Sequence, residues 1–133
     1  MTCVFCEIIR GEREAYIIYE DEEVMVFLDR YPLTRGHSLV VPRRHYEYIY
    51  DVPDDLLARL IVTAREVARA QVKGLGASGV RIVQNNGSDA GQIIFHVHFH
   101  VIPFYGEARR HRRVLSREEG EVVSAALREA LKG

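Results

Sequence analysis

The chain has 133 residues, a length that suits one compact domain with a single hydrophobic core. Hydrophobic residues make up 47% and charged residues 28%, and the formal net charge is −1. This balance is typical of a globular domain and excludes the strong charge bias of many nucleic-acid or membrane-surface binders. No apolar run approaches the roughly 20 residues that span a bilayer, and the first residues do not resemble a signal peptide. We therefore expect a cytoplasmic protein with neither a membrane nor a nucleic-acid partner.

Short apolar runs bounded by proline and glycine predict the strands of a sheet. Residues 24–28 and 38–41 are predicted as buried strands, with a loop at 29–36 between them. Residues 80–84 and 93–102 are predicted as two further strands. Because tight loops join most of these segments, we expect an antiparallel sheet of about five strands.

Apolar residues at helical spacing predict two helices. The longer helix follows Asp51, which we expect to cap it, and Gly74 and Gly76 are expected to end it. The second helix is expected to begin at Ser116, where Ser116 and Glu119 match a capping box. The predicted fold class is therefore α+β, with one long helix and a C-terminal helix.

Three histidines alternate with hydrophobic residues in the segment 95–101. Since successive side chains of a strand point to opposite faces, Phe95, Val97, Phe99 and Val101 should face the core. The histidines, which should share the other face about 6–7 Å apart, are His96, His98 and His100. Histidines on an exposed face need no special explanation singly, but three of the chain's six in strict alternation indicate a functional site.

Aligned imidazoles can ligate a metal ion or bind a phosphate, with one neutral ring attacking phosphorus. Metal–nitrogen bonds of about 2 Å are short compared with the spacing along a strand, so three such rings do not easily reach one ion. The spacing suits a chain of phosphate oxygens better. The pattern therefore favours phosphate chemistry.

Cys3 and Cys6 are the only cysteines and are spaced as Cys-x-x-Cys. In a cytosolic chain this spacing favours metal or redox chemistry over a structural disulfide. A redox pair is less expected because no thioredoxin-like βαβ pattern surrounds it. The remaining alternative is a pair of ordinary buried cysteines.

Several motifs, in order, resemble the histidine triad (HIT) superfamily between Cys3 and about Pro103. They are the histidine segment 96–102, the stretch 5–12, the stretch 36–42 with His45, and the loop from Asn85-Asn86-Gly87 to Gly91-Gln92. The short length is similar to the Hint-like branch, and the cysteine pair to its zinc-containing prokaryotic members. The resemblance implies a HIT-like fold over residues 1–133 as a single domain, with a C-terminal helical tail at about 104–133.

The resemblance also implies catalytic roles for His98, His100 and His37. His98 would attack the α-phosphorus of a nucleotide and form a covalent nucleotidyl-histidine, which water then cleaves to release a nucleoside monophosphate. The carbonyl of His96 would orient His98, while His37 and His100 would donate to the phosphate oxygens. No catalytic metal is then expected.

The nucleotide-binding positions implied by the resemblance are Asp29, Asn85, Gly91, Gln92, His98 and His100. Asp29 would hold the ribose hydroxyls, although an aspartate before Pro32 also suits a turn. Asn85 would bind the ribose or phosphate region, and the backbone at Gly91 and Gln92 a phosphate, since glycine permits close approach of a ligand.

One position departs from the family pattern. Ile93 stands where Ser or Thr usually follows the Gly-Gln pair and supports the leaving group, and isoleucine cannot form a hydrogen bond. Cleavage is therefore expected to be slower or differently selective.

For the metal, the resemblance implies a structural Zn²⁺ bound by Cys3, Cys6, His45 and His96. Two cysteines and two histidines suit a closed tetrahedral zinc site. Such a site would tie the N-terminus to two other segments and contribute folding free energy.

The expected activity is cleavage at the α-phosphate of a purine nucleotide, an AMP or GMP derivative of the phosphoramidate or adenylate type. One alternative is a dinucleoside polyphosphate (Ap3A or Ap4A) hydrolase, and another, of a different class, is a purine-nucleotide-binding scaffold with vestigial catalysis. The resemblance further implies a homodimer. The basic run 109–113 is either a solvated surface segment or a contact with a charged substrate or RNA.

Overall fold

The computed structural model describes residues 3–106 and 111–133. Its elements are α1 (Val4–Ile9), β1 (Ile17–Glu20), β2 (Val24–Leu28), β3 (Ser38–Pro42), the 3-10 turn η1 (Ile49–Asp51), α2 (Asp54–Leu75), β4 (Gly79–Val83), the 3-10 turn η2 (Ser88–Ala90), β5 (Phe99–Phe104) and α3 (Arg117–Lys132). The five strands form one antiparallel sheet in the order β1-β2-β3-β5-β4. The predicted α+β class and strand number are confirmed.

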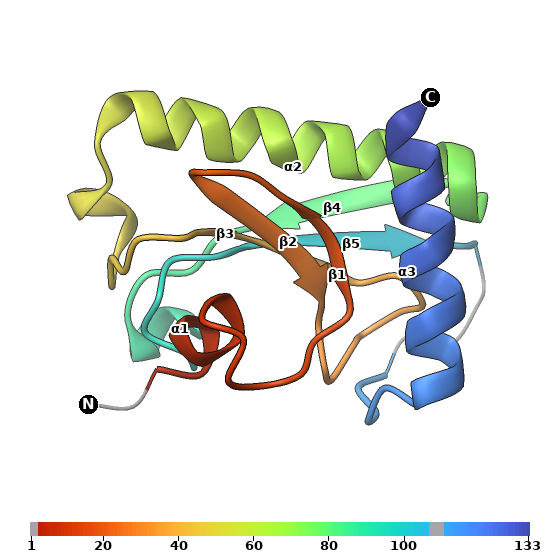
Figure 1. Ribbon diagram of the computed structural model, residues 1–133, viewed down its shortest axis with the longest axis horizontal. Coiled ribbons are helices and arrows are strands. Elements are labelled where there is room, and N and C mark those ends of the chain that lie inside the picture. Colours follow the sequence, from red (N-terminus) through yellow and green to blue (C-terminus); the bar gives the residue numbers. More distant parts are fainter. Residues whose placement is uncertain (1–2, 107–110) are drawn as a thin grey trace.

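Helices cover both faces of the sheet, as Figure 1 shows. On one face, α2 and α3 pack over the strands and bury a large core that includes Val40, Leu60 and Leu127. On the opposite face, the short α1 closes a smaller cluster around Phe5 and Phe27. Because both faces are covered, every residue of β2 and β3 is buried. Burial of this apolar surface is the main stabilising contribution to the fold.

The ends of α2 differ from those predicted. Asp51 lies in η1 and does not cap the helix; the N-cap position is Pro53, which makes no side-chain capping hydrogen bond. Gly74 lies inside the helix, where a Cβ would come within 2.8 Å of the Ala130 Cβ on α3, so this glycine permits close helix packing. Gly76 ends the helix as predicted, in the left-handed conformation with φ +74°.

The C-terminal helix begins as predicted. Ser116 is its N-cap, and the Ser116 Oγ accepts a hydrogen bond from the Glu119 N–H at 3.1 Å. The Glu119 carboxylate does not complete a capping box but forms an ion pair with Arg113 at 2.8 Å. Within the parts of the chain described above, no helix is long and apolar enough to cross a membrane.

The histidine strand is shorter than predicted. Its ladder begins at Phe99 and extends to Phe104, so residues 93–98 approach the sheet without pairing in it. The Val97 N–H instead donates to the Tyr46 carbonyl at 2.7 Å. The alternation of side chains holds for Val97, Phe99 and Val101, which are buried in the large core, but Phe95 is 37% exposed and lies outside it.

Candidate active site and metal centre

His98 is held with one ring nitrogen free. Its side chain is 7% exposed, and the edge of the Phe5 ring of α1 packs against it with 5.1 Å between ring centroids. The carbonyl of His96 lies 2.7 Å from the His98 Nδ1, so Nδ1 carries the proton and donates it. Burial lowers the pKa of His98 below its usual value, which keeps the ring neutral. The Nε2 lone pair is therefore available to attack an electrophile.

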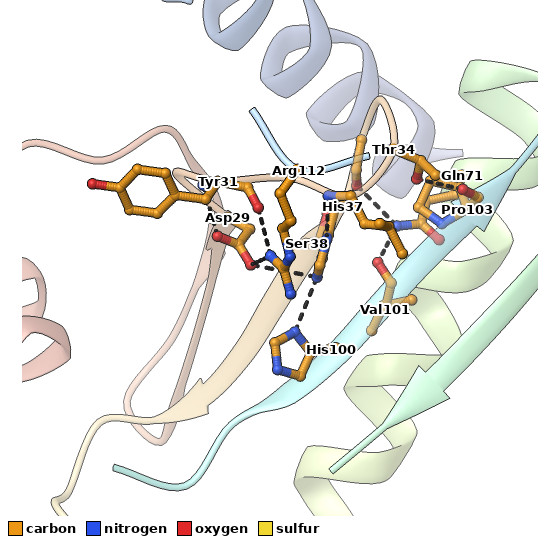
Figure 2. A network of polar contacts seen from close by, with 12 residues as sticks. Asp29, Tyr31, Thr34, His37, Ser38, Gln71, His100, Val101, Pro103 and Arg112 are labelled. Atoms are coloured by element: carbon orange, nitrogen blue, oxygen red, sulfur yellow. Dashed lines mark hydrogen bonds and ion pairs between the residues drawn. The ribbon is translucent and has the colours of Figure 1, made fainter. Parts of the chain in front are cut away.

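Hydrogen bonds also define the proton positions of His37 and His100. The Leu33 N–H donates to the His37 Nδ1 at 3.0 Å, which leaves the His37 proton on Nε2. The His37 Nε2–H in turn donates to the His100 Nδ1 at 3.0 Å (Figure 2). The His100 proton must then lie on Nε2, where it can be donated to a ligand.

His37 lies behind His100 and does not present a free ring nitrogen to a ligand. It is fully buried, and contacts within the protein occupy both of its ring nitrogens. Burial lowers the pKa of His37 to about 3 and that of His100 to about 4, so both rings are neutral near pH 7. Of the two, only His100 is positioned to present a donor.

Asp29 follows β2 directly, and each oxygen of its carboxylate accepts a hydrogen bond from a protein donor. Its Oδ1 accepts from the Tyr31 N–H at 2.9 Å, and its Oδ2 lies 3.4 Å from the His37 Nε2. The guanidinium of Arg112 donates to the same Oδ2 at 3.0 Å and to the Tyr31 carbonyl, as Figure 2 shows. In the basic run, the half-exposed Arg112 thus contacts the buried Asp29 carboxylate, while Arg109 and Arg110 lie outside the described residues.

The loop before the histidines is organised by Gln92. This side chain is 3% exposed; its Oε1 accepts from the Gly87 N–H at 2.7 Å and its Nε2 donates to the Glu47 carbonyl at 2.8 Å. Gly91 has φ +96°, and a Cβ there would lie 3.8 Å from the Asn85 Nδ2. The described residues make no hydrogen bond to the Asn85 side chain, whose amide can therefore serve a ligand. Ile93 is 86% exposed.

Sequence reasoning missed Gln71 of α2, which is fully buried beside the histidines. Its Nε2 donates to the carbonyls of Gly36 and Val101, the residues directly before His37 and directly after His100. The signal was present in the sequence, because Leu60, Ala64 and Val67 continue at helical spacing to position 71. A polar residue in a core stripe indicates a buried polar partner.

The four predicted metal ligands converge. The ligand atoms of Cys3, Cys6, His45 and His96 all lie within 4.8 Å of one another. The His96 Nδ1 lies 3.4 Å from the Cys3 Sγ and 3.2 Å from the His45 Nδ1, separations close to those between ligands of a tetrahedral zinc ion. The His96 Nε2 donates to the Pro42 carbonyl at 2.8 Å, which leaves the Nδ1 lone pair aimed at the cluster. The donor set therefore fits zinc.

A second group, formed by Asp29, His37 and His100, has ligand atoms within the same 4.8 Å but does not fit a metal. Ligation through the His37 Nε2 would move the proton to Nδ1, against the Leu33 N–H that points at it. His37 and His100 are instead joined by one hydrogen bond, and the Asp29 Oδ2 lies 3.4 Å from the His37 Nε2.

Residues 10–107 match the HIT domain family. A histidine triad nucleotide-binding protein from Sulfolobus tokodaii, described as hypothetical, is 35% identical with a TM-score of 0.93, over 98% of this chain and 92% of its own. A zinc-bound histidine triad family protein from Mycobacterium smegmatis is 41% identical with a TM-score of 0.85, over 97% and 95%. Adenylylsulfatase HINT3 of Arabidopsis thaliana is 38% identical over 95% of this chain and 68% of its own.

The chain therefore belongs to the HIT family, a superfamily of nucleotide-binding proteins and nucleotide hydrolases.

Proposed function

We propose that the chain hydrolyses nucleotides at the α-phosphorus through a covalent nucleotidyl-His98 intermediate. The observation that carries the proposal is the hydrogen bond from the His98 Nδ1 to the His96 carbonyl, because it leaves Nε2 unprotonated in a buried, neutral ring. A nucleophilic histidine needs this arrangement. The alternating histidines alone do not specify which ring attacks.

The reaction has two steps. The His98 Nε2 lone pair forms a bond to the α-phosphorus as the bond to the leaving group breaks, and the leaving group departs with that electron pair. Water then attacks the same phosphorus and releases a proton to solvent, the P–Nε2 bond breaks with its electron pair returning to Nε2, and a nucleoside monophosphate leaves. The His100 Nε2–H donates to a phosphate oxygen while negative charge accumulates, and His37 acts through His100 by holding its Nδ1.

Adenylates are the substrate class that we favour. Ile93 offers no hydrogen bond to a departing group, which disfavours an amine that must leave with a proton. A carboxylate or sulfate leaves as a stable anion, and the relative from Arabidopsis thaliana is named an adenylylsulfatase. The Asn85 amide and the backbone at Gly91 and Gln92 support the proposed phosphate and ribose contacts, with a purine nucleotide as the substrate.

Steady-state rates on three substrates test this proposal: adenylyl sulfate, an adenosine 5′-phosphoramidate and diadenosine tetraphosphate. We expect the highest kcat/KM on adenylyl sulfate and a loss of at least about 1,000-fold in His98→Ala. Highest kcat/KM on diadenosine tetraphosphate would favour the polyphosphate hydrolase instead. Tight AMP binding without turnover of any of the three would favour the scaffold.

We further propose a structural Zn²⁺ held by Cys3, Cys6, His45 and His96. When bound, the ion would cross-link the start of α1 to the segments after β3 and before β5, and it would take no part in the reaction. Both cysteines are free in the fold, as thiolate ligation requires. We also propose a cytoplasmic location, where thiols stay reduced and can ligate a metal.

A homodimer is the proposed assembly. β4 is an edge strand, since among the described strands it pairs only with β5. Ile82 on β4 and Val72 on α2 are exposed hydrophobic residues, and an open strand edge that carries an exposed apolar side chain suits pairing with a second copy. Light scattering after gel filtration should give twice the mass of the chain, and Ile82→Glu should give the monomer mass.

A further inference from the structure

Arg112 reaches the proposed active site from outside the part of the chain that matches the HIT domain. That match covers residues 10–107, whereas Arg112 belongs to the irregular segment 111–116 that leads into α3. Its guanidinium lies between the Asp29 carboxylate and the Tyr31 carbonyl, as Figure 2 shows. A residue beyond the family core thus covers a carboxylate within the site.

Protein groups limit a ligand's access to the Asp29 carboxylate, although its two oxygens accept only two of the roughly four hydrogen bonds that they could. Asp29 is 9% exposed, its Oδ1 accepts from the Tyr31 N–H, and its Oδ2 is shared by Arg112 and the nearby His37. We add to the proposed function that Asp29 holds the ribose hydroxyls, as the resemblance to the family implies; those hydroxyls must then donate to a carboxylate whose Oδ2 already accepts from Arg112. The ribose and Arg112 therefore compete for one carboxylate.

The side chain of Arg112 can move away from Asp29 while the rest of its segment stays in place. Its side chain is 51% exposed although that of Asp29 is only 12% exposed, so solvent reaches the guanidinium and screens its side of the ion pair. The neighbouring backbone is anchored separately, by the Leu115 N–H on the Arg30 carbonyl at 2.8 Å and by the ion pair of Arg113 with Glu119. Rotation of one side chain is enough to open the carboxylate.

We propose that Arg112 is a specificity-determining residue that occupies the ribose-binding carboxylate in the free protein and reduces the gain in affinity from the ribose hydroxyls. The inference rests on the proposed function. It assigns Arg112 a defined consequence: the protein discriminates weakly between ribonucleotides and nucleotides without the ribose hydroxyls, and loss of Arg112 makes the discrimination stronger.

The test compares AMP with 2′,3′-dideoxy-AMP, which lacks both hydroxyls, by titration calorimetry. The readout is the ratio of the two dissociation constants, which removes any general effect of charge on phosphate binding. In Arg112→Gln we expect the preference for AMP to rise about threefold, the scale of a solvent-screened ion pair. Arg113→Gln is the matched control from the same segment and should leave the ratio unchanged, because Arg113 pairs with Glu119.

A measurement on the unmodified protein provides a second test. Raising the salt concentration weakens the exposed ion pair, so the preference for AMP should increase with ionic strength in the native protein and not in Arg112→Gln. A preference that falls in Arg112→Gln would overturn the inference, since Arg112 would then bind the nucleotide itself. An unchanged ratio with normal AMP binding overturns the inference alone, whereas no AMP binding by any form overturns the proposed function as well.

Discussion

His96 and His98 stand two residues apart in one segment, and both give a ring N–H to a backbone carbonyl. His96 uses Nε2, on the Pro42 carbonyl, and keeps Nδ1 for the cluster of Cys3, Cys6 and His45. His98 uses Nδ1, on the carbonyl of His96 itself, and keeps Nε2 for the nucleotide side. The two histidines thus differ in the nitrogen that keeps its lone pair, because opposite ring nitrogens donate to the backbone: His96 is suited to a metal and His98 to attack on phosphorus.

The backbone carbonyl that accepts from each ring therefore determines which nitrogen of that histidine stays unprotonated. A third histidine, His100, extends the rule: its Nδ1 accepts from His37, so it presents a proton where His98 presents a lone pair. The metal cluster and the proposed phosphate site can therefore be changed separately by substitution.

Removal of the metal should produce the largest effect, on the His96 side. We expect one zinc per chain by elemental analysis, and a melting temperature lower by roughly 10 °C or more in the double variant Cys3→Ser, Cys6→Ser. A chelator should lower the melting temperature of the native protein but not that of the variant. Zinc that is absent from the native protein, or retained by the variant, would exclude the site.

The pH dependence of stability tests whether the fold keeps His100 neutral. An unfolded histidine takes up a proton near pH 6.5, whereas folded His100, with its pKa lowered to about 4 by burial, does not. Between pH 6.5 and 4 the unfolded state therefore binds more protons, and stability falls as the pH falls. From pH 7 to 5 His100 should account for a loss of about 2 kcal/mol in the free energy of unfolding.

Urea unfolding at both pH values measures this loss. His100→Asn keeps an acceptor for the His37 Nε2–H but does not titrate, so its stability should depend less on pH by that amount. Equal pH dependence in the two proteins would show that His100 is not held neutral by the fold.

Gln71→Met tests the support of the phosphate side from α2. The substitution conserves approximate size but removes two donors to the carbonyls next to His37 and His100, so we expect kcat to fall about tenfold with KM nearly unchanged. Thr63→Val is the matched control, since Thr63 is a buried polar residue of the same helix whose hydroxyl, among the described residues, bonds only to Arg59. If both variants lose equal stability and activity, Gln71 is structural and does not position the histidines.

Ile93→Ser should have the smallest effect, and it tests whether a hydroxyl at position 93 supports the leaving group. We expect kcat on a phosphoramidate with a poor amine leaving group to rise about threefold, because a hydroxyl can support the departing nitrogen. Ile93 is highly exposed, so stability should not change. Ile93→Val removes bulk without adding a hydroxyl and should behave like the native protein; unchanged kinetics in the serine variant would argue against this role.

The sequence was sufficient for the elements with strong local patterns. The buried strands β2 and β3 and the cap at Ser116 agree with prediction because each depends on neighbouring residues. The apolar spacing predicted the helix α2, but of the positions expected on its buried face, Ile61 and Val72 are exposed. α1 and β1 were not identified individually, since 6 and 4 residues are too short to show a period. Asp51 was predicted to cap α2, but Pro53 occupies the N-cap position in an extended conformation. The histidine strand was predicted to begin at residue 93, but its hydrogen-bonded ladder begins at Phe99.

The sequence predicted which residues form the site but not the hydrogen bonds that set their protonation. Motif resemblance brought together Cys3, Cys6, His45 and His96, and the structure places them in one cluster. The tautomers depend on the carbonyls of Pro42 and His96 and on the Leu33 N–H, and backbone groups carry no sequence signal. Contacts from distant segments, such as Gln71 and Arg112, likewise follow only from the fold.

The central claim is that His98 attacks through Nε2 while His96 does not react. It is tested most directly by trapping the protein with an adenylate at mildly alkaline pH, where a phosphorus–nitrogen bond of histidine survives, and mapping the adduct by mass spectrometry and NMR. We predict one AMP per chain, on the Nε2 of His98, and none in His98→Ala. An adduct on His96 or His100, or undiminished labelling of His98→Ala, would contradict the account.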